Sequence, residues 1–346
     1  MKATVFHDHG PPSVLKYEEF PDPEIRDDQI LVDVKAVALN HLDLFTRNGI
    51  PGLTLEMPHI LGSDISGVIR EVGKAVSRDF LPGQRVVIDP GKSCGVCEYC
   101  IRGEQSLCSQ YGILGEHHRG GYSDFMAVDS QNVIPVPEHV DLSFEQLAAT
   151  PLTFMTAWRM LMTKAKVRPG EDVLIVGAGG GVAVAALQIA KVAGARVIVT
   201  SSSDEKLEQA KKLGASVAIN HKTNPDYHKE VWVLTNKRGV DIVVDSVGEV
   251  TWEKSLRSLT KGGRLVTCGA TSGPHVVTNL NLVFWKQLEI LGSTMASRSE
   301  LREVLKLIWN GQLTPVVDSV FPLSKAKEAH ERLENGLQFG KIVLKP

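Results

Sequence analysis

The pattern of apolar and polar positions changes partway along the chain. Up to about residue 128, short apolar runs alternate with turns rich in Gly and Pro, a pattern typical of strands joined by tight connections. We therefore predict an irregular antiparallel β barrel or sandwich for this part. The expected strands are Thr4–Phe6, Gln29–Val37, Ile65–Val72, Arg85–Ile88 and Ser123–Val128.

From about residue 171 to residue 292, apolar runs alternate with helical periodicity instead. About six strands separated by helices predict an α/β fold with a doubly wound parallel sheet. The expected strands are Val173–Val176, Ala195–Thr200, Ser216–Ile219, Val240–Val244, Gly263–Thr267 and Leu288–Leu291. The expected helices are Val182–Lys191, Asp204–Leu213, Asp226–Lys237 and Glu249–Thr260.

The segments that flank this α/β stretch are helical in pattern. Ser143–Gln146 has the residues of a capping box, and Thr153–Lys164 carries a second helical pattern. Two amphipathic helices, 299–310 and 324–335, and a last strand, 341–344, have no place in the wound sheet. We expect residues 1–150 and 293–346 to form one domain and residues 151–292 to form the other.

A glycine cluster, Gly177 to Gly181, follows the buried strand Val173–Val176 and precedes a helix. Glycines let the backbone approach a bulky anion, and the helix directs its unpaired N–H groups at that anion. A plain tight turn is the alternative. The βαβ context favours a dinucleotide pyrophosphate site.

Composition excludes several kinds of partner. The 346 residues carry a formal net charge of −2 with both signs mixed, which gives no reason to expect nucleic acid or an anionic membrane surface. No apolar run approaches the roughly 18 residues of a membrane span. The first residues lack the apolar stretch of a signal peptide. We expect a cytoplasmic protein that acts on a small-molecule substrate.

Four of the five cysteines, Cys94, Cys97, Cys100 and Cys108, fall within one short segment. Four thiolates close a tetrahedron around Zn²⁺ and leave no open position for a substrate. Disulfides and a catalytic dithiol are the alternatives, and a cytoplasmic location disfavours the disulfides. We predict one structural zinc per chain. The fifth, Cys268, is expected to be a small buried apolar residue.

This cysteine spacing, between a β-rich part and a wound sheet, resembles the medium-chain dehydrogenase/reductase superfamily. The similarity spans the chain and includes the segments 62–67, 177–181, 245–248, 262–266 and 340–343. It implies a GroES-like catalytic domain and a Rossmann domain, with a four-cysteine lobe at about residues 91–110 that holds structural zinc. It also implies homodimers or homotetramers built through the edge of the cofactor domain, with Phe284 to Leu291 as a candidate segment.

The same comparison shows a departure at the catalytic metal. Zinc alcohol dehydrogenases carry a cysteine ligand where this chain has Asn40, and a histidine ligand where it has Ser63. Their third ligand, a cysteine, corresponds to Leu152 or Thr153. Catalytic zinc in such a site needs soft or imidazole ligands and one open position, and these residues cannot hold it tightly.

The replacing residues resemble the zinc-free quinone and enone reductases of the same superfamily. Asn40, His41 and Asp43 in the segment 39–43, which we expect to be a loop, and Asp64 are the candidate catalytic residues. A metal site rebuilt from other side chains would instead make the protein a true alcohol dehydrogenase. The candidate ligands for such a site are His41, Asp43, His59, Asp64, His117 and His118.

The resemblance implies NADP or NAD as cofactor. The second strand of the wound sheet ends in serines, with Lys206 nearby and no acidic residue at the position that selects NAD, which favours NADPH. The expected contacts with the cofactor are Gly177, Gly179, Gly180, Gly181, Val182, Ser201, Ser202, Lys206, Val247, Gly269 and Lys341.

Without zinc, hydrogen-bond donors must stabilise the charge that develops on a carbonyl oxygen. The Asn40 amide could do so, and His41, a tyrosine or water could deliver the proton. An enolate needs less stabilisation than an alkoxide, so we expect reduction of an activated C=C bond in an enone, quinone or 2-enoyl thioester, ahead of a C=O group. A dinucleotide-binding protein without catalytic activity is the remaining alternative.

Overall fold

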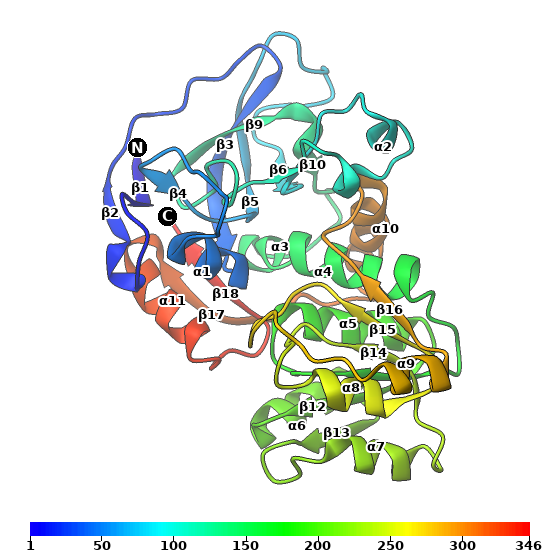
Figure 1. Ribbon diagram of the computed structural model, residues 1–346. Helices are drawn as coiled ribbons and strands as arrows, with labels where there is room; N and C mark the ends of the chain where they lie inside the picture. The colour runs from blue at the N-terminus through cyan, green and yellow to red at the C-terminus, as the bar shows by residue number, and fades with distance from the viewer. The chain divides into compact units, whose positions relative to one another are not determined.

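The chain leaves its first unit after Leu152 and returns to it at Ser297. The computed structural model describes all residues from Met1 to Pro346 (Figure 1). Residues 1–152 and 297–346 form the first unit, and residues 153–296 form the second. The return of the last fifty residues to the first unit is as expected, and the two boundaries fall slightly later in the chain than the sequence pattern indicated.

A seven-stranded sheet is the main element of the first unit, with β3 (Gln29–Ala38) near its middle. Apolar residues of β3 are buried on both faces, which explains its central position. The order along the sheet is β10 (Val133–Pro135), β6 (Arg85–Ile88), β5 (Asp64–Val72), β3, β18 (Lys341–Lys345) and β17 (Val317–Pro322), with β9 (Phe125–Asp129) also paired to β3.

Smaller sheets and helices complete the first unit. One sheet contains β2 (Lys16–Glu19), β1 (Lys2–Phe6) and β4 (His59–Ile60), and another contains β7 (Gly91–Lys92) and β8 (Gly112–Ile113). The helices are α1 (His41–Asn48), α2 (Glu98–Ile101), α3 (Phe144–Ala148), α10 (Arg298–Trp309) and α11 (Ala326–Glu334). Short 3₁₀ turns span Pro12–Val14, Gln105–Leu107, Ser130–Asn132 and Leu323–Lys325.

Part of the segment 39–43, expected to be a loop, is helical, because α1 begins at His41 directly after its N-cap. Asn40 is the N-cap, and the Asp43 side chain accepts a hydrogen bond from the Asn40 N–H at 2.7 Å, as in a capping box. The capping residues were present in the sequence, but the helix is only eight residues long. The difference matters because the start of α1 fixes the orientation of the Asn40 and Asp43 side chains.

A six-stranded parallel sheet forms the second unit and confirms the doubly wound fold. Its order is β13 (Val217–Asn220), β12 (Arg196–Ser201), β11 (Asp172–Ile175), β14 (Val240–Val244), β15 (Leu259–Thr267) and β16 (Glu289–Gly292). The helices are α5 (Gly181–Val192), α6 (Asp204–Leu213), α7 (Tyr227–Leu234), α8 (Trp252–Ser258) and α9 (Leu280–Lys286). Helix α4 (Pro151–Trp158) and the π-helical turn Arg159–Lys164 lead into this unit.

Two helix ends in the second unit differ from the sequence pattern. Helix α7 was expected to reach residue 237 but ends at Leu234, because Asn236 and Lys237 adopt positive φ values of 52° and 63°. Helix α8 was expected to reach residue 260, yet β15 already begins at Leu259. The residues at the expected end of α8 have helical propensity, but Leu259 pairs with Val240 of β14 and therefore belongs to the sheet.

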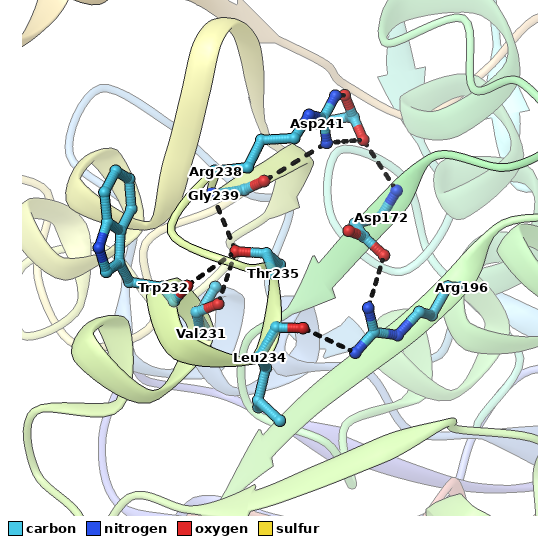
Figure 2. Close-up of polar contacts among 9 residues, drawn as sticks. All are labelled: Asp172, Arg196, Val231, Trp232, Leu234, Thr235, Arg238, Gly239 and Asp241. Carbon is cyan, nitrogen blue, oxygen red and sulfur yellow. Dashed lines mark hydrogen bonds and ion pairs between the residues drawn. The ribbon is translucent and has the colours of Figure 1, made fainter.

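An ionic network joins the amino ends of three parallel strands (Figure 2). Asp241 accepts a hydrogen bond from the Asp172 N–H at 2.9 Å and pairs with Arg238. Arg196 reaches the Asp172 carboxylate at 3.5 Å and the Leu234 carbonyl oxygen at 3.2 Å. The network therefore connects the amino ends of β11, β12 and β14. The cofactor residues are expected at the other edge of the sheet, at the carboxyl ends of the strands.

The outer strand of this sheet, β16, has one unpaired edge. Phe284 and Trp285, on the preceding helix, are 58% and 72% exposed. These residues fall in the segment expected to join two copies of the chain, and that assembly stays a prediction. Every helix in the molecule is too short or too polar to span a bilayer.

Candidate active site

The residues expected to contact the dinucleotide gather at the carboxyl ends of the parallel strands. Gly177 follows β11, Ser201 ends β12, Val247 follows β14 and Gly269 follows β15. The chain winds in opposite directions on the two sides of β11 and β14, and such switch points are where open α/β sheets bind ligands. The second unit therefore places these residues at neighbouring positions along the carboxyl edge of its sheet.

The glycine turn leaves space above the start of α5. Gly177 has a φ of +80°, a conformation that favours glycine, and a Cβ there would lie 3.3 Å from Val247 Cγ2. Gly180 is the N-cap of α5, and a Cβ there would meet nothing within 4 Å. The open space and the unpaired N–H groups of Gly181 and Val182 suit a phosphate group.

The end of β12 presents hydroxyl groups. Ser203 caps α6 by accepting from the Lys206 N–H at 3.3 Å, whereas Ser202 is exposed. Asp204, the first acidic residue after the strand, accepts from Asn220 Nδ2 at 2.7 Å. Its carboxylate is therefore already engaged within the second unit.

Asp245 is a residue whose role the sequence did not reveal. It is 1% exposed and accepts from the N–H groups of Val247 and Gly248 at 2.8 and 3.2 Å. It also accepts from the hydroxyls of Thr251 and Ser255 at 2.8 and 2.6 Å. Four donors on one buried carboxylate fix the turn that carries Val247. In the sequence, the segment 245–248 resembled the family, but it did not indicate which groups would bind the Asp245 carboxylate.

In the first unit, a buried triangle joins Asn40, Asp64 and Lys341. Lys341 Nζ lies 2.8 Å from Asp64 Oδ2 and donates to Asn40 Oδ1 at 2.6 Å. Asn40 Nδ2 donates to the same Asp64 oxygen at 2.9 Å. Asp64 Oδ1 accepts from the Leu152 N–H at 2.6 Å. Lys341, expected as a cofactor contact, thus lies with the candidate catalytic residues; the pairing was not evident because 277 residues separate it from Asp64.

Asp43 holds the backbone beside this triangle. Its oxygens accept from the N–H groups of Asn40 at 2.7 Å and Gly62 at 2.9 Å. Burial raises the pKa of Asp43 to about 7, although both N–H groups and Lys341 act to lower it. Next to Gly62, Ser63 is fully buried and its hydroxyl has no hydrogen-bond partner. Asp43 therefore braces the segments that carry Asn40 and Ser63.

His41, the first residue of α1, lies close enough to Lys341 to sense its charge. Burial, with a smaller contribution from Lys341, lowers the pKa of His41. The ring is therefore neutral at neutral pH. Such an imidazole is a poor proton donor compared with the imidazolium that general acid catalysis would use.

The four clustered cysteines form a group suited to a metal. Their Sγ atoms all lie within 4.8 Å of one another, and all four are free thiols. The Sγ atoms of Cys94 and Cys108 are 3.5 Å apart, and those of Cys94 and Cys100 are 3.9 Å apart. Zinc–sulfur bonds of about 2.3 Å give tetrahedral edges of about 3.8 Å, so the cluster fits zinc.

Backbone N–H groups favour the thiolate form of Cys94 within this cluster. The N–H groups of Val96 and Cys97 lower the pKa of Cys94 to about 6. The Gln110 N–H donates to Cys108 Sγ at 3.3 Å. Cys268 is outside the lobe and is half-buried, not fully buried as expected. Desolvation raises the pKa of its thiol to about 12.

The alternative metal ligands do not assemble. His59 is buried in β4 with Nε2 3.3 Å from the Gly115 carbonyl oxygen, and His117 lies beside Glu116. In the whole chain, the group of three or more His, Cys, Asp or Glu side chains with metal-binding geometry is the cysteine cluster. His41, His59, His117 and His118 form no such group with Asp43 and Asp64.

Comparison with known proteins agrees with both units. The family model of the alcohol dehydrogenase GroES-like domain matches residues 26–138, and that of the zinc-binding dehydrogenase matches residues 181–310. A zinc-type alcohol dehydrogenase-like protein of Schizosaccharomyces pombe is 35% identical over 96% of this chain and 95% of its own length. An acryloyl-coenzyme A reductase of Sulfurisphaera tokodaii is 32% identical over the full length of both.

A solved structure described as an NAD-dependent alcohol dehydrogenase is 48% identical, covers both chains completely and has a TM-score of 0.96. The chain therefore belongs to the medium-chain dehydrogenase/reductase superfamily, as a zinc-type alcohol dehydrogenase-like oxidoreductase.

Proposed function

We propose that this protein is an NADPH-preferring reductase of activated C=C bonds that works without a catalytic zinc. Its substrate would be an enone, a quinone or a 2-enoyl thioester. The observation that carries the proposal is the identity and bonding of Asn40 and Ser63. The resemblance to zinc alcohol dehydrogenases implies that these two residues replace a thiolate ligand and an imidazole ligand.

The donors at these positions do not suit a catalytic zinc. Asn40 Oδ1 is occupied by Lys341 and its Nδ2 by Asp64. The Ser63 side chain offers only a neutral hydroxyl. Catalytic zinc sites use three nitrogen, sulfur or carboxylate ligands, and neither residue supplies one. Asp64 offers a carboxylate, but that carboxylate is already paired with the Lys341 ammonium.

The bound nicotinamide cofactor would supply a hydride. When the hydride adds to the β-carbon, the π electrons move to the carbonyl oxygen as an enolate. A solvent proton on the α-carbon then completes the saturated product. Donors at Asn40 and at the nearby backbone would stabilise the enolate. The lowered pKa of His41 favours water over that side chain as the proton source.

The preference for NADPH rests on the end of β12. Ser202 and the segment that carries Lys206 suit a 2′-phosphate, and Asp204 is held by Asn220 rather than left for a ribose hydroxyl. The structural relative described as NAD-dependent favours the other cofactor, so both must be measured.

The test is a substrate panel assayed with NADPH and NADH, together with elemental analysis. We expect an enone, quinone or 2-enoyl thioester to be reduced faster than aldehydes, with one zinc per chain. A preference for alcohols, two zincs per chain and turnover that fails on chelation would overturn the proposal.

Alcohol–aldehyde interconversion is the second candidate, favoured by the 48% identity to a structure described as an alcohol dehydrogenase. The acryloyl-coenzyme A reductase, at 32% identity over the same full length, favours alkene reduction instead. The two functions differ in where the hydride goes, to a carbonyl carbon or to a β-carbon. Product analysis with a deuterated cofactor and an α,β-unsaturated aldehyde separates them in one reaction.

A further inference from the structure

Tyr122 packs directly against the backbone of the segment that carries Ser63. Its side chain is fully buried, and a Cβ on Gly62 would lie 2.5 Å from Tyr122 Cδ1. Gly62 has a φ of +98°, a conformation that favours glycine. The Tyr122 N–H donates to the Leu61 carbonyl oxygen at 3.0 Å. Because the contact leaves no space, a displacement of the Tyr122 side chain is transmitted to the backbone that leads into Ser63.

The Tyr122 hydroxyl is held by His330 of α11. His330 Nε2 lies 3.2 Å from the hydroxyl oxygen, and the two aromatic rings meet edge to face with centroids 5.9 Å apart. The other ring nitrogen, Nδ1, accepts from Arg47 Nη1 at 2.9 Å. A guanidinium only donates, so the imidazole carries its proton on Nε2 and donates it to Tyr122. His330 thus connects Tyr122 to a residue of α1.

These contacts form a closed circuit, because α1 also begins at the candidate site. Asn40 is the N-cap of α1, and the Asp43 carboxylate accepts from the N–H groups of Asn40 at 2.7 Å and Gly62 at 2.9 Å. The members of this contact circuit, in order, are Asp43, Gly62, Tyr122, His330 and Arg47, from which α1 leads back to Asp43. The four side chains in the circuit are fully buried, so water does not compete for its contacts.

We propose that Tyr122 and His330 are positioning residues of the candidate active site. Their contact closes the circuit and so holds the start of α1, with Asn40, in register with the segment that carries Ser63. Neither Tyr122 nor His330 touches the substrate or the cofactor in this role. The proposal rests on the proposed function, in which Asn40 helps to stabilise the enolate.

A purely structural role for the same contact is the alternative. It would lower the stability of the whole first unit, with no specific effect on the candidate site. Both roles predict some loss of stability, so the free energy of unfolding alone does not distinguish them. The positioning role predicts a loss in the chemical step and a local loosening of the backbone at Asn40 and Gly62.

The first experiment removes the contact from either side. Tyr122→Phe removes only the hydroxyl. His330→Asn keeps an acceptor for Arg47, near the place of Nδ1, and removes the donor to Tyr122. In each variant we expect kcat for an activated alkene to fall by about 10- to 100-fold, as for a small displacement of catalytic groups. The KM for the alkene and the dissociation constant of NADPH should change by less than about threefold.

A double variant and a matched control complete this experiment. Tyr122→Phe and His330→Asn break the same contact, so together they should lower kcat no further than either does alone. Thr235→Val is the control, because it removes a buried hydroxyl of the second unit that bonds to Val231 and Gly239. It should keep the wild-type kcat. Losses that multiply in the double variant, wild-type kcat in both single variants, or an equal loss in the control would overturn the proposal.

The second experiment reads the backbone without an assay of turnover. The Asn40 and Gly62 amides both donate to Asp43 and should exchange slowly with solvent. In Tyr122→Phe, hydrogen exchange followed by mass spectrometry should be at least about tenfold faster in peptides that contain these amides. The amides of β3, in the middle of the large sheet, should keep their wild-type rates. Equal acceleration in β3, or no acceleration at Asn40 and Gly62, would contradict the positioning role.

The two experiments also separate the inference from the proposed function. If the wild-type protein reduces no activated alkene, the proposed function fails, and hydrogen exchange still reports on the contact circuit. If alkenes are reduced but Tyr122→Phe and His330→Asn keep full kcat, the function stands and the positioning role fails.

Discussion

Arg47 Nη1 donates a hydrogen bond to His330 Nδ1 at 2.9 Å and so joins α1 to α11. Because Nδ1 accepts, the proton resides on Nε2, which lies 3.2 Å from the Tyr122 hydroxyl and donates to it. Burial and Arg47 lower the pKa of His330 to about 3, so the ring is neutral. Arg47 also donates to the Gly10 carbonyl oxygen and pairs with Glu334.

Removal of this guanidinium should destabilise the first unit. Arg47 is fully buried, and Arg47→Met would leave His330 Nδ1 and the Gly10 carbonyl oxygen without a donor. We expect a loss of about 2–4 kcal/mol in the free energy of unfolding, measured by urea denaturation with circular dichroism. The control, Arg257→Met, breaks an exposed pair with Glu253 and should cost about 0.5 kcal/mol. Equal losses in the two variants would contradict the assignment.

The buried carboxyl of Asp43 should make stability depend on pH. Its folded pKa of about 7 is above the ordinary value of 3.8, so the folded state keeps a proton that the unfolded state has lost. The contribution of Asp43 to stability is therefore fully present below about pH 4 and declines as pH rises towards 7. Asp43→Asn has no such titration.

This dependence is measured as a difference between two proteins. The free energy of unfolding of the wild type minus that of Asp43→Asn should fall by roughly 3 kcal/mol between about pH 5 and pH 8. Other titrating groups cancel in the difference. A difference that stays flat over this range would mean that Asp43 is ionised throughout.

The four-cysteine cluster should bind a structural zinc. Cys97→Ser removes one of four ligands, and because zinc-binding energy is folding energy in such lobes, we expect lower soluble yield and a lower Tm. Zinc content should fall from about one per chain towards zero. Cys268→Ser, outside the cluster, is the matched control and should keep its zinc. Unchanged zinc and Tm in Cys97→Ser would exclude the structural zinc.

Cofactor preference should be sensitive to Ser202, which is exposed just after β12. Ser202→Asp places a carboxylate where a 2′-phosphate would approach and a ribose hydroxyl could bind. We expect the ratio of kcat/KM for NADPH to that for NADH to fall by at least about tenfold. Ser202→Ala should change the ratio far less. A wild-type preference for NADH would refute the proposed specificity.

The sequence predicted what depends on local pattern. The spacing of four cysteines within a short segment predicted that their thiols would cluster. The order of strand, glycine turn and helix predicted the wound sheet and which residues lie at its carboxyl edge. The last strand was assigned to the first unit because the late elements had no place in the wound sheet, and β18 pairs there with β17 and β3.

What the sequence could not reveal depends on contacts between distant residues. Lys341 and Asp64 are 277 positions apart, and Arg47 and His330 are 283 apart, so no periodicity links them. Helix α1 was missed although Asn40 and Asp43 have capping-box spacing, because it is only eight residues long. The start of β15 was assigned to a helix because its residues pair with β14 only in the folded sheet.

The most direct test of the central claim is zinc content measured with turnover on one preparation, before and after exposure to a chelator. The account predicts about one zinc per chain, and enone reduction that continues while that zinc and the fold are retained. Two zincs per chain, with turnover lost in proportion to removal of the second, would contradict it.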